Sequence, residues 1–231
     1  MKKILLILIL ILAYSLFNIL IWFKDNNHTK ELIEEINNGI IPSNNEKIIN
    51  INYLIHKNKD TVGYIIVNNT NISYPFLKTS NNSFYLNHSF DKTVSNSGWL
   101  FMDYRNNKNL NNKNTIIYAH ARKDLSMFGT LKNTIKKYWY NNKDNHIIKV
   151  ITKDNNYLYQ VFSTYTIENE SYYITTDFKS DKEYKNFLDT IKQRSIYNYK
   201  IKLNTNDRIL TLSSCYSNNK KIVLHAKRLD N

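Results

Sequence analysis

The spacing of hydrophobic and polar residues divides the chain into three parts. An apolar run without a charge extends from Ile4 to Phe23, and as a helix it could cross the roughly 30 Å hydrocarbon core of a bilayer. Apolar residues at helical spacing follow, and from Thr61 onward short apolar runs alternate with polar clusters, which is typical of strands. We expect an N-terminal tip and anchor in 1–24, a helical membrane-proximal segment in 25–60 and a β-rich domain in 61–231.

The flanks of the apolar run indicate an uncleaved anchor. The run ends in Ile-Trp-Phe-Lys without the small-x-small pattern of a signal-peptide cleavage site, and Trp22 suits the membrane interface. Lys2 and Lys3 precede the run, whereas its other flank mixes Lys with acidic residues. The positive-inside tendency therefore predicts a single-pass plasma-membrane protein with a cytoplasmic N-terminus and residues 24–231 on the outer face.

The remaining pattern predicts a mainly β fold with peripheral helices. Two short N-terminal helices are expected, in residues 29–39 and 46–57. Eight runs rich in β-branched and aromatic residues then predict a closed or nearly closed barrel: VGYIIV, NISYPFL, GWLFM, NTIIYAH, HIIKVIT, NYLYQVFSTYTI, RILTLSS and KIVLHAKRL. A further helix is expected in residues 180–195, where Ser180 can cap and Glu183 stands three residues later.

Charge and composition argue against two classes of function. The formal net charge is +13, but the Lys residues are scattered among Asn and no nucleic-acid-binding motif is present. We interpret the charge as a solvated surface and expect no nucleic-acid partner. His and Cys residues do not occur in pairs with metal-ligand spacing, so we expect no metal and no cofactor.

Cys215 is the only cysteine and the first candidate for chemistry. A lone thiol in an exported domain cannot form an internal disulfide and is a candidate nucleophile, although a buried strand cysteine is more often inert. Ser213 and Ser214 precede it and could supply oxyanion donors or shape the site. Among the histidines, His120 ends an apolar strand and can reach a cleft. His225 lies within a strand, where a hydrogen-bonded wall residue is the more common role.

Five motifs in one order resemble those of a known family. TNISYP, FMDYRN, YAHARKDLSMFGTL, LTLSSC and IVLHAKRL are similar to motifs of the sortases, most closely class B sortases, the membrane-anchored cysteine transpeptidases of Gram-positive bacteria. The resemblance covers residues 62–229. It implies an eight-stranded sortase-type β-barrel with a helix between strands six and seven, where residues 180–195 fall. Asp103, Tyr104 and Arg105 of FMDYRN are expected to order a loop rather than to react.

The resemblance also implies roles for individual residues. Cys215 matches the nucleophile and His120 the general acid/base. The family usually has an arginine on the eighth strand, and here that place falls on Lys221, with Lys220 and Arg228 as alternates. Arginine can fork two hydrogen bonds to an oxyanion, whereas lysine is a mobile point charge, so Lys221 predicts weaker stabilisation.

The implied reaction is acyl transfer. A sortase of this kind cleaves the C-terminal sorting motif of secreted proteins, forms a thioacyl-enzyme at its cysteine and passes the acyl group to a peptidoglycan amine of the cell wall. The replaced arginine leaves a second hypothesis open, a catalytically impaired scaffold or binding module. A hydrolytic cysteine peptidase is a third and less favoured hypothesis, because such enzymes usually place the cysteine before the histidine in sequence.

Overall fold

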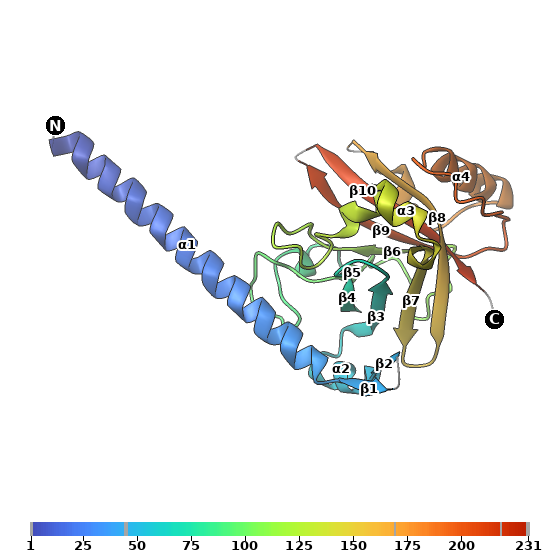
Figure 1. Cartoon of the computed structure of the whole chain (residues 1–231), viewed down its shortest axis with the longest axis horizontal. Coiled ribbons are helices and arrows are strands. Elements are labelled where there is room, and N and C mark those ends of the chain that lie inside the picture. Colours follow the sequence, from blue (N-terminus) through green and yellow to red (C-terminus); the bar gives the residue numbers. More distant parts are fainter. Residues whose placement is uncertain (1, 44–45, 169, 218, 230–231) are drawn as a thin grey trace.

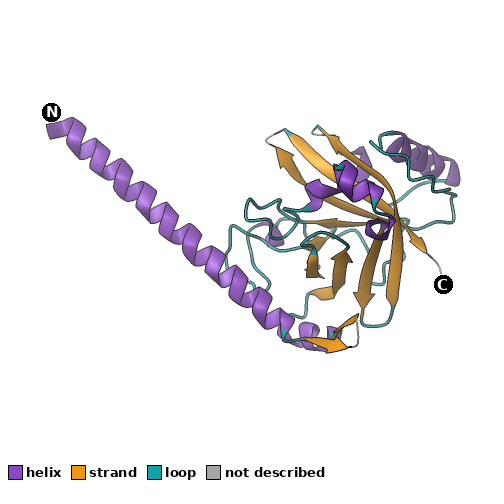
Figure 2. Ribbon diagram, in the orientation of Figure 1, coloured by secondary structure: helices purple, strands orange, loops and turns teal. Residues whose placement is uncertain are grey.

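The centre of the molecule is a closed barrel of eight strands (Figures 1 and 2). The computed structural model describes residues 2–43, 46–168, 170–217 and 219–229, so the outermost residues of the expected ranges 1–24 and 61–231 lie outside it. The barrel strands are β3 (Thr61–Val67), β4 (Ser73–Leu77), β5 (Phe101–Met102), β6 (Asn114–Tyr118), β7 (Ile147–Thr152), β8 (Asn156–Ile167), β9 (Ile209–Ser217) and β10 (Lys220–Leu229). Each contains part of one of the eight predicted runs, which confirms the expected fold class.

Strand order places the C-terminal strands beside a strand from the middle of the chain. Around the barrel the order is β10-β8-β7-β3-β4-β5-β6-β9. The β4–β5 and β6–β9 pairs are parallel, and the other described pairs are antiparallel. Short helical segments fill the connections: η1 (Phe84–Leu86), η2 (Leu131–Ile135), α3 (Lys137–Asn141), η3 (Lys143–His146) and η4 (Tyr172–Ile174).

The predicted helix between the sixth and seventh barrel strands is α4 (Asp181–Gln193). The Ser180 hydroxyl accepts a hydrogen bond from the Glu183 N–H at 3.2 Å, and Glu183 Oε2 accepts one from the Lys179 N–H at 2.7 Å, which fixes the helix start. Its apolar face packs against the outside of the barrel and forms a second core. The buried residues of that core are Phe162, Tyr165, Ile167, Tyr173, Tyr184, Phe187, Leu188, Ile191, Ile209 and Val223.

The N-terminal helix differs from the prediction. Residues 2–37 form one continuous helix, α1 (Lys2–Asn37), so the separate helix expected in residues 29–39 is its final part. The reason is local, because α1 contains no Gly or Pro that would end it before Gly39. By length and composition α1 could cross a membrane: its most apolar window has a mean hydropathy of 2.9 and none of that window is buried. Its N-terminal part projects away from the barrel (Figure 1).

The helix predicted in residues 46–57 is wrong in its first part. Residues 46–49 form strand β2 (Glu46–Ile49), which pairs with β1 (Ile40–Ser43), and helix α2 (Ile51–Lys57) begins only afterwards. The Asn50 side chain accepts a hydrogen bond from the Tyr53 N–H at 3.0 Å and so caps α2. The isoleucines of this stretch fit either spacing, and the cap decides where the helix starts.

Candidate active site

Strand pairing places Cys215 between two of the predicted site residues. In the parallel β6–β9 pair the last partners are Tyr118 and Ser213, so the chain that leads from β6 to His120 starts next to the part of β9 that carries Cys215. The Ser214 hydroxyl donates a hydrogen bond to the Ala119 carbonyl at 2.6 Å, which keeps the two chains together beyond this pair. On the other side, β10 places Lys221 directly opposite Cys215. The thiol itself is exposed.

The His120 imidazole rests against the loop between β4 and β5. Its Nε2 lies 2.7 Å from the Leu86 carbonyl oxygen. A carbonyl can only accept, so Nε2 carries the hydrogen and Nδ1 is the acceptor of the neutral ring. Gly98, with φ of +57°, packs behind the ring: a Cβ at this position would lie 3.0 Å from His120 Cδ2 and 2.8 Å from the Leu86 oxygen. This glycine lets the loop approach the histidine closely.

The two serines before the thiol use their hydroxyls to hold the strand. Ser214 gives its single hydroxyl proton to Ala119, as described above. Ser213 Oγ lies 2.9 Å from the Tyr173 hydroxyl. Both serines are buried, with exposures of 3% and 4%. The observed contacts suit the site-shaping role, because an oxyanion donor needs a proton that points at the substrate.

The alternates for the basic residue lie in different surroundings. Lys220 is exposed and pairs with Ser217, next to the turn. Arg228 is seven residues beyond Lys221 on β10, a separation of about 23 Å along an extended strand. Its guanidinium lies over the Tyr157 ring, 5.1 Å from the centroid. The fold therefore brings Lys221 next to Cys215 and keeps Arg228 at the other end of the strand.

Tyr173 is a neighbour of the thiol that sequence reasoning missed. It lies on η4 and contacts Ser213, which points to the same side of β9 as Cys215. Burial raises the pKa of Tyr173 and outweighs the lowering by its hydrogen bond with Ser213, and the charge of Cys215 adds a smaller increase. The Tyr173 phenol is therefore neutral at physiological pH. One tyrosine among 18 carries no sequence signal of this role.

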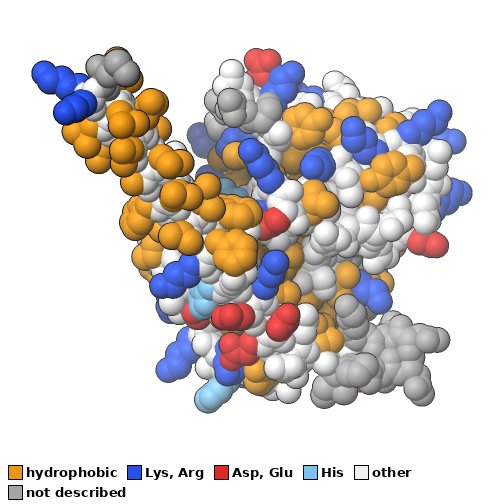
Figure 3. Space-filling view, turned by 60° about the vertical axis from the view of Figure 1, so that its left-hand side comes forward, with side chains coloured by type: hydrophobic (Ala, Val, Ile, Leu, Met, Phe, Trp, Pro, Cys, Tyr) orange, Lys and Arg blue, Asp and Glu red, His pale blue; other side chains and the backbone are white. Residues whose placement is uncertain are grey.

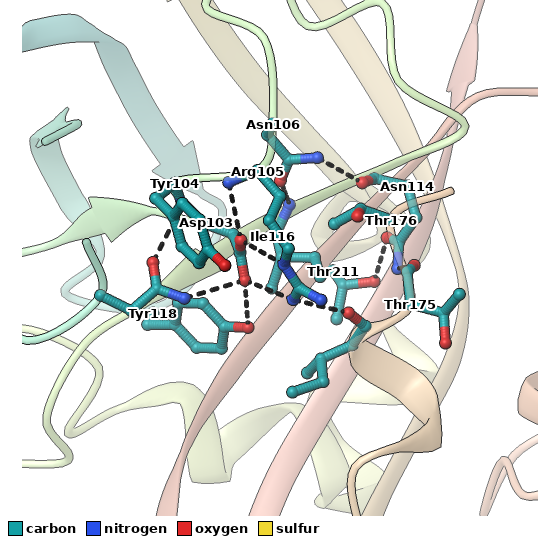
Figure 4. Close-up of polar contacts among 12 residues, drawn as sticks. Asp103, Tyr104, Arg105, Asn106, Asn114, Ile116, Tyr118, Thr175, Thr176 and Thr211 are labelled. Carbon is teal, nitrogen blue, oxygen red and sulfur yellow. Dashed lines mark hydrogen bonds and ion pairs between the residues drawn. The ribbon is translucent and has the colours of Figure 1, made fainter. Parts of the chain in front are cut away.

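A buried carboxylate ties η4 to the end of β5 (Figure 4). Asp103 is fully buried and accepts hydrogen bonds from Arg105 Nη2 at 2.7 Å and from the Tyr118 hydroxyl at 2.9 Å. Arg105 Nη2 also donates to the Ile174 carbonyl at 2.9 Å. Burial would raise the pKa of Asp103, but the hydrogen bonds and the charge of Arg105 hold it below its usual range. These contacts support the expectation that the FMDYRN motif orders a loop.

A second buried network, the His225 circuit, consists of Tyr172, Tyr165, His225, Thr211 and Asn114. Thr211 donates its proton to Asn114 Oδ1 at 2.6 Å, so His225 Nδ1, at 2.8 Å from Thr211, must be the donor in that pair. Nε2 then accepts from the Tyr165 hydroxyl at 2.9 Å, and Tyr165 accepts from Tyr172 at 3.2 Å. Burial lowers the pKa of His225 to about 3, so the ring is neutral, as this order of donors requires.

The circuit begins and ends at the same segment of chain. Tyr172 is the first residue of η4, and Asn114 Nδ2 donates to the Tyr173 carbonyl at 3.2 Å and to the Thr175 carbonyl at 2.9 Å. His225 is therefore the hydrogen-bonded wall residue that the sequence favoured. Its hydrogen bonds help to hold η4, and Tyr173 of η4 contacts Ser213 in the candidate site.

The described part of the chain contains no cluster of side chains suited to bind a metal ion. No group of three or more His, Cys, Asp or Glu residues there could hold a metal ion. The expectation of a reaction without metal or cofactor stays a prediction.

Comparison with known proteins identifies the family to which this fold belongs. The family model described as "Sortase domain" matches residues 65–229. Sortase B of Staphylococcus aureus is 41% identical over 175 residues, which are 74% of this chain and 70% of that protein.

Solved structures extend the similarity to the three-dimensional fold. Sortase B of Bacillus anthracis, in complex with AAEK1, is 32% identical with a TM-score of 0.79, and the match covers 90% of this chain and 100% of that one. A sortase B–substrate complex of Staphylococcus aureus is 34% identical with a TM-score of 0.73, over 90% and 94% of the two chains. With this barrel and these matches, the chain belongs to the sortase family of transpeptidases and is most similar to its class B members.

Proposed function

We propose that the protein is a membrane-anchored cysteine transpeptidase. It cleaves the C-terminal sorting motif of secreted proteins and transfers the acyl group to an amine of cell-wall peptidoglycan. The observation that carries the proposal is the position of Cys215 on β9, with His120 beyond β6 on one side and Lys221 of β10 on the other. The similarity to a sortase B–substrate complex supports the substrate class.

The reaction proceeds in two acyl transfers. The Cys215 thiolate attacks the scissile carbonyl, and the oxyanion forms beside the ammonium group of Lys221. His120, as imidazolium, gives its proton to the departing amine while the C–N bond breaks and a thioester remains. An amine of the wall then attacks the thioester, neutral His120 takes its proton, and the thiolate leaves. The reaction is redox-neutral and regenerates both catalytic residues.

The location follows from α1. Its apolar part would cross the plasma membrane with Lys2 and Lys3 in the cytoplasm, and the barrel would lie on the outer face near emerging substrates. Membrane lipid around this helix, sorting-signal proteins and wall peptidoglycan are the proposed partners.

The test is a cleavage assay on the full chain in detergent micelles. A panel of fluorogenic sorting peptides is incubated with and without an amine acceptor, and both cleavage and the transfer product are measured. We expect transfer in the presence of amine and its loss in Cys215→Ala and His120→Ala. Cleavage that never yields transfer product, even at high amine, would favour the hydrolytic peptidase instead.

Lys221 is the specific observation behind the second hypothesis, a catalytically impaired scaffold. If Lys221 holds the oxyanion, Lys221→Ala lowers kcat by about 10²- to 10³-fold, as the loss of one oxyanion donor does elsewhere. Lys221→Arg should give a kcat equal to or higher than that of the original protein. Lys220→Ala, at the exposed neighbouring position, is the control and should leave kcat unchanged. A wild-type chain that binds sorting peptides but cleaves them only after Lys221→Arg would support the scaffold.

A further inference from the structure

The part of α1 that follows its apolar run lies against two loops of the barrel domain. Figure 3 shows apolar side chains along the projecting part of the helix and charged and histidine side chains below them, where the helix meets the domain. The residues that make these contacts are Asp25, Asn26, His28 and Thr29, which we call the α1 clamp. Both loops are also neighbours of His120.

The first loop forms the wall behind the imidazole. Ser97 Oγ donates a hydrogen bond to Asp25 Oδ2 at 3.2 Å, and Thr29 Oγ1 lies 3.1 Å from the same Ser97 oxygen. Ser97 is fully buried and Thr29 is 3% exposed, so water does not compete for this contact. The next residue, Gly98, packs against the ring of His120. The helix therefore holds the residue adjacent to the one that backs the catalytic histidine.

The second loop continues directly from His120. Arg122 Nη2 donates a hydrogen bond to Asn26 Oδ1 and also pairs with Asp124 at 3.1 Å. The loop closes on its own start, because the Phe128 N–H donates to the His120 carbonyl at 3.0 Å. The Arg122 side chain is only 12% exposed. Residues of α1 thus contact both loops around the His120 imidazole: the loop that packs behind the ring and the loop that follows His120 in the sequence.

His28 adds a contact at the edge of the first loop. Its Nε2 lies 2.9 Å from Asp91 Oδ2 and 3.1 Å from Thr93 Oγ1. Burial would raise the pKa of Asp91, but hydrogen bonds from Thr93 and the neighbouring His28 hold it below its usual value. This contact is partly exposed, unlike the one at Ser97.

We propose that the α1 clamp is a positioning element for His120, so that the anchor helix is part of the active-site scaffold as well as a tether. The proposal rests on the catalytic role of His120 given above. Because α1 is one unbroken helix, the orientation of its apolar part is transmitted to both loops without a hinge. The clamp residues do not touch the reacting atoms. They act by fixing the imidazole relative to Cys215.

Asn26 offers a matched pair of substitutions for the test. Asn26→Ala removes the acceptor for Arg122, whereas Asn26→Asp keeps an acceptor and adds a charge of opposite sign to the guanidinium. Glu35→Gln is the control on the same helix, since Glu35 contacts Lys57 of α2 instead of the His120 loops. All variants are made in the full chain in detergent micelles. Asn26 is only half-buried, so the three variants should keep the unfolding temperature of the original protein.

The readout is the rate at which iodoacetamide alkylates Cys215 as a function of pH, because a nearby imidazolium favours the thiolate. We expect Asn26→Ala to move the midpoint of the alkylation profile to higher pH and to lower the alkylation rate at neutral pH at least threefold, because a displaced imidazolium stabilises the thiolate less. Asn26→Asp and Glu35→Gln should match the original profile. In the peptide assay kcat should fall while KM stays constant.

Two results separate this proposal from the proposed function. An Asn26→Ala profile that superimposes on the original, in a protein that transfers sorting peptides, overturns the clamp alone. A shifted profile in a protein that cleaves none of the peptides keeps the clamp and counts against the transpeptidase. A Glu35→Gln profile that shifts as much as that of Asn26→Ala also overturns the proposal, because the effect would then come from the general attachment of the helix.

Discussion

His225 and His28 both support loops beside the candidate active site, but in opposite surroundings. His225 is fully buried, and its circuit holds η4, the segment that carries Tyr173. The side chain of His28 is 36% exposed and contacts the loop that backs His120. The thiol side of the site is therefore held by the barrel core, and the histidine side is held partly by a helix that leaves the domain.

This difference predicts different responses to mutation. In a buried hydrogen-bond network, removal of one side chain lowers the free energy of unfolding. The remaining donors and acceptors lose their partner, and water cannot reach them to replace it. The contacts that half-buried Asn26 and partly exposed His28 make from α1 cost less stability when they are broken. Damage on the thiol side should therefore appear in the free energy of unfolding. Damage to the α1 clamp should appear in the alkylation of Cys215 and in the peptide assay.

The largest effect on stability is expected at Asp103. Asp103→Ala removes the acceptor of the Tyr118 hydroxyl, the Arg105 backbone N–H and the Arg105 side chain. Each donor left unsatisfied costs about 1–3 kcal/mol, and the Arg105 side chain costs least because it is 36% exposed. Urea unfolding followed by circular dichroism measures the change. Asp189→Ala, which breaks the exposed pair with Lys185, is the control and should cost less than about 1 kcal/mol. Similar losses for both variants would contradict the contrast between buried and exposed supports.

His225 is the next most sensitive position. In His225→Leu the Tyr165 and Thr211 hydroxyls lose their partner inside the barrel wall, at a cost of about 2–4 kcal/mol in unfolding free energy. His225→Gln can offer one amide donor and one acceptor, so it should recover part of this loss. Equal stability of the Leu and Gln variants would mean that packing, not hydrogen bonding, explains the histidine.

The same residue predicts how stability depends on pH. The pKa of His225 is about 3 in the folded protein and 6.5 in a free side chain, so between these values only the unfolded chain binds the proton. Its contribution is complete above pH 6.5 and falls by about 1.4 kcal/mol per pH unit as the pH decreases toward 3. Burial also lowers the pKa of His146, which adds a contribution of the same sign. The difference between the original protein and His225→Gln in urea unfolding at several pH values isolates the His225 part, and parallel curves would contradict it.

The sequence predicts the parts of this arrangement that depend on local patterns. Eight β-branched runs give the barrel, and a capped amphipathic segment gives α4. The single cysteine and the position of His120 after an apolar strand point to the thiol and its partner. These features need only neighbouring residues, because strand and helix spacing repeat within a few positions. The resemblance to sortases adds the order of the motifs.

Features that depend on distant contacts could not be predicted. Thr211 and Asn114 are 97 residues apart, and their hydrogen bond exists only because β6 and β9 are parallel neighbours. Tyr173 reaches the site through a connection without a regular pattern. The α1 clamp depends on the absence of any helix-ending residue between the apolar run and Gly39, which spacing alone did not suggest. All of these contacts join residues that are far apart in the sequence, so local spacing does not predict them.

The smallest effect on stability is expected at His28. His28→Ala removes the contact with Asp91 and Thr93, and a partly exposed pair of this kind contributes at most about 1 kcal/mol to the free energy of unfolding. The effect should shrink further in 1 M salt, where the Debye length is about 3 Å. In the alkylation assay His28→Ala should shift the Cys215 profile less than Asn26→Ala. Asn26 contacts Arg122, two residues after His120, whereas His28 contacts a more distant part of the first loop, where the buried Thr29–Ser97 contact remains. A loss of stability as large as that of His225→Leu would show that the helix side is held as firmly as the core side, and the comparison between the two histidines would fail.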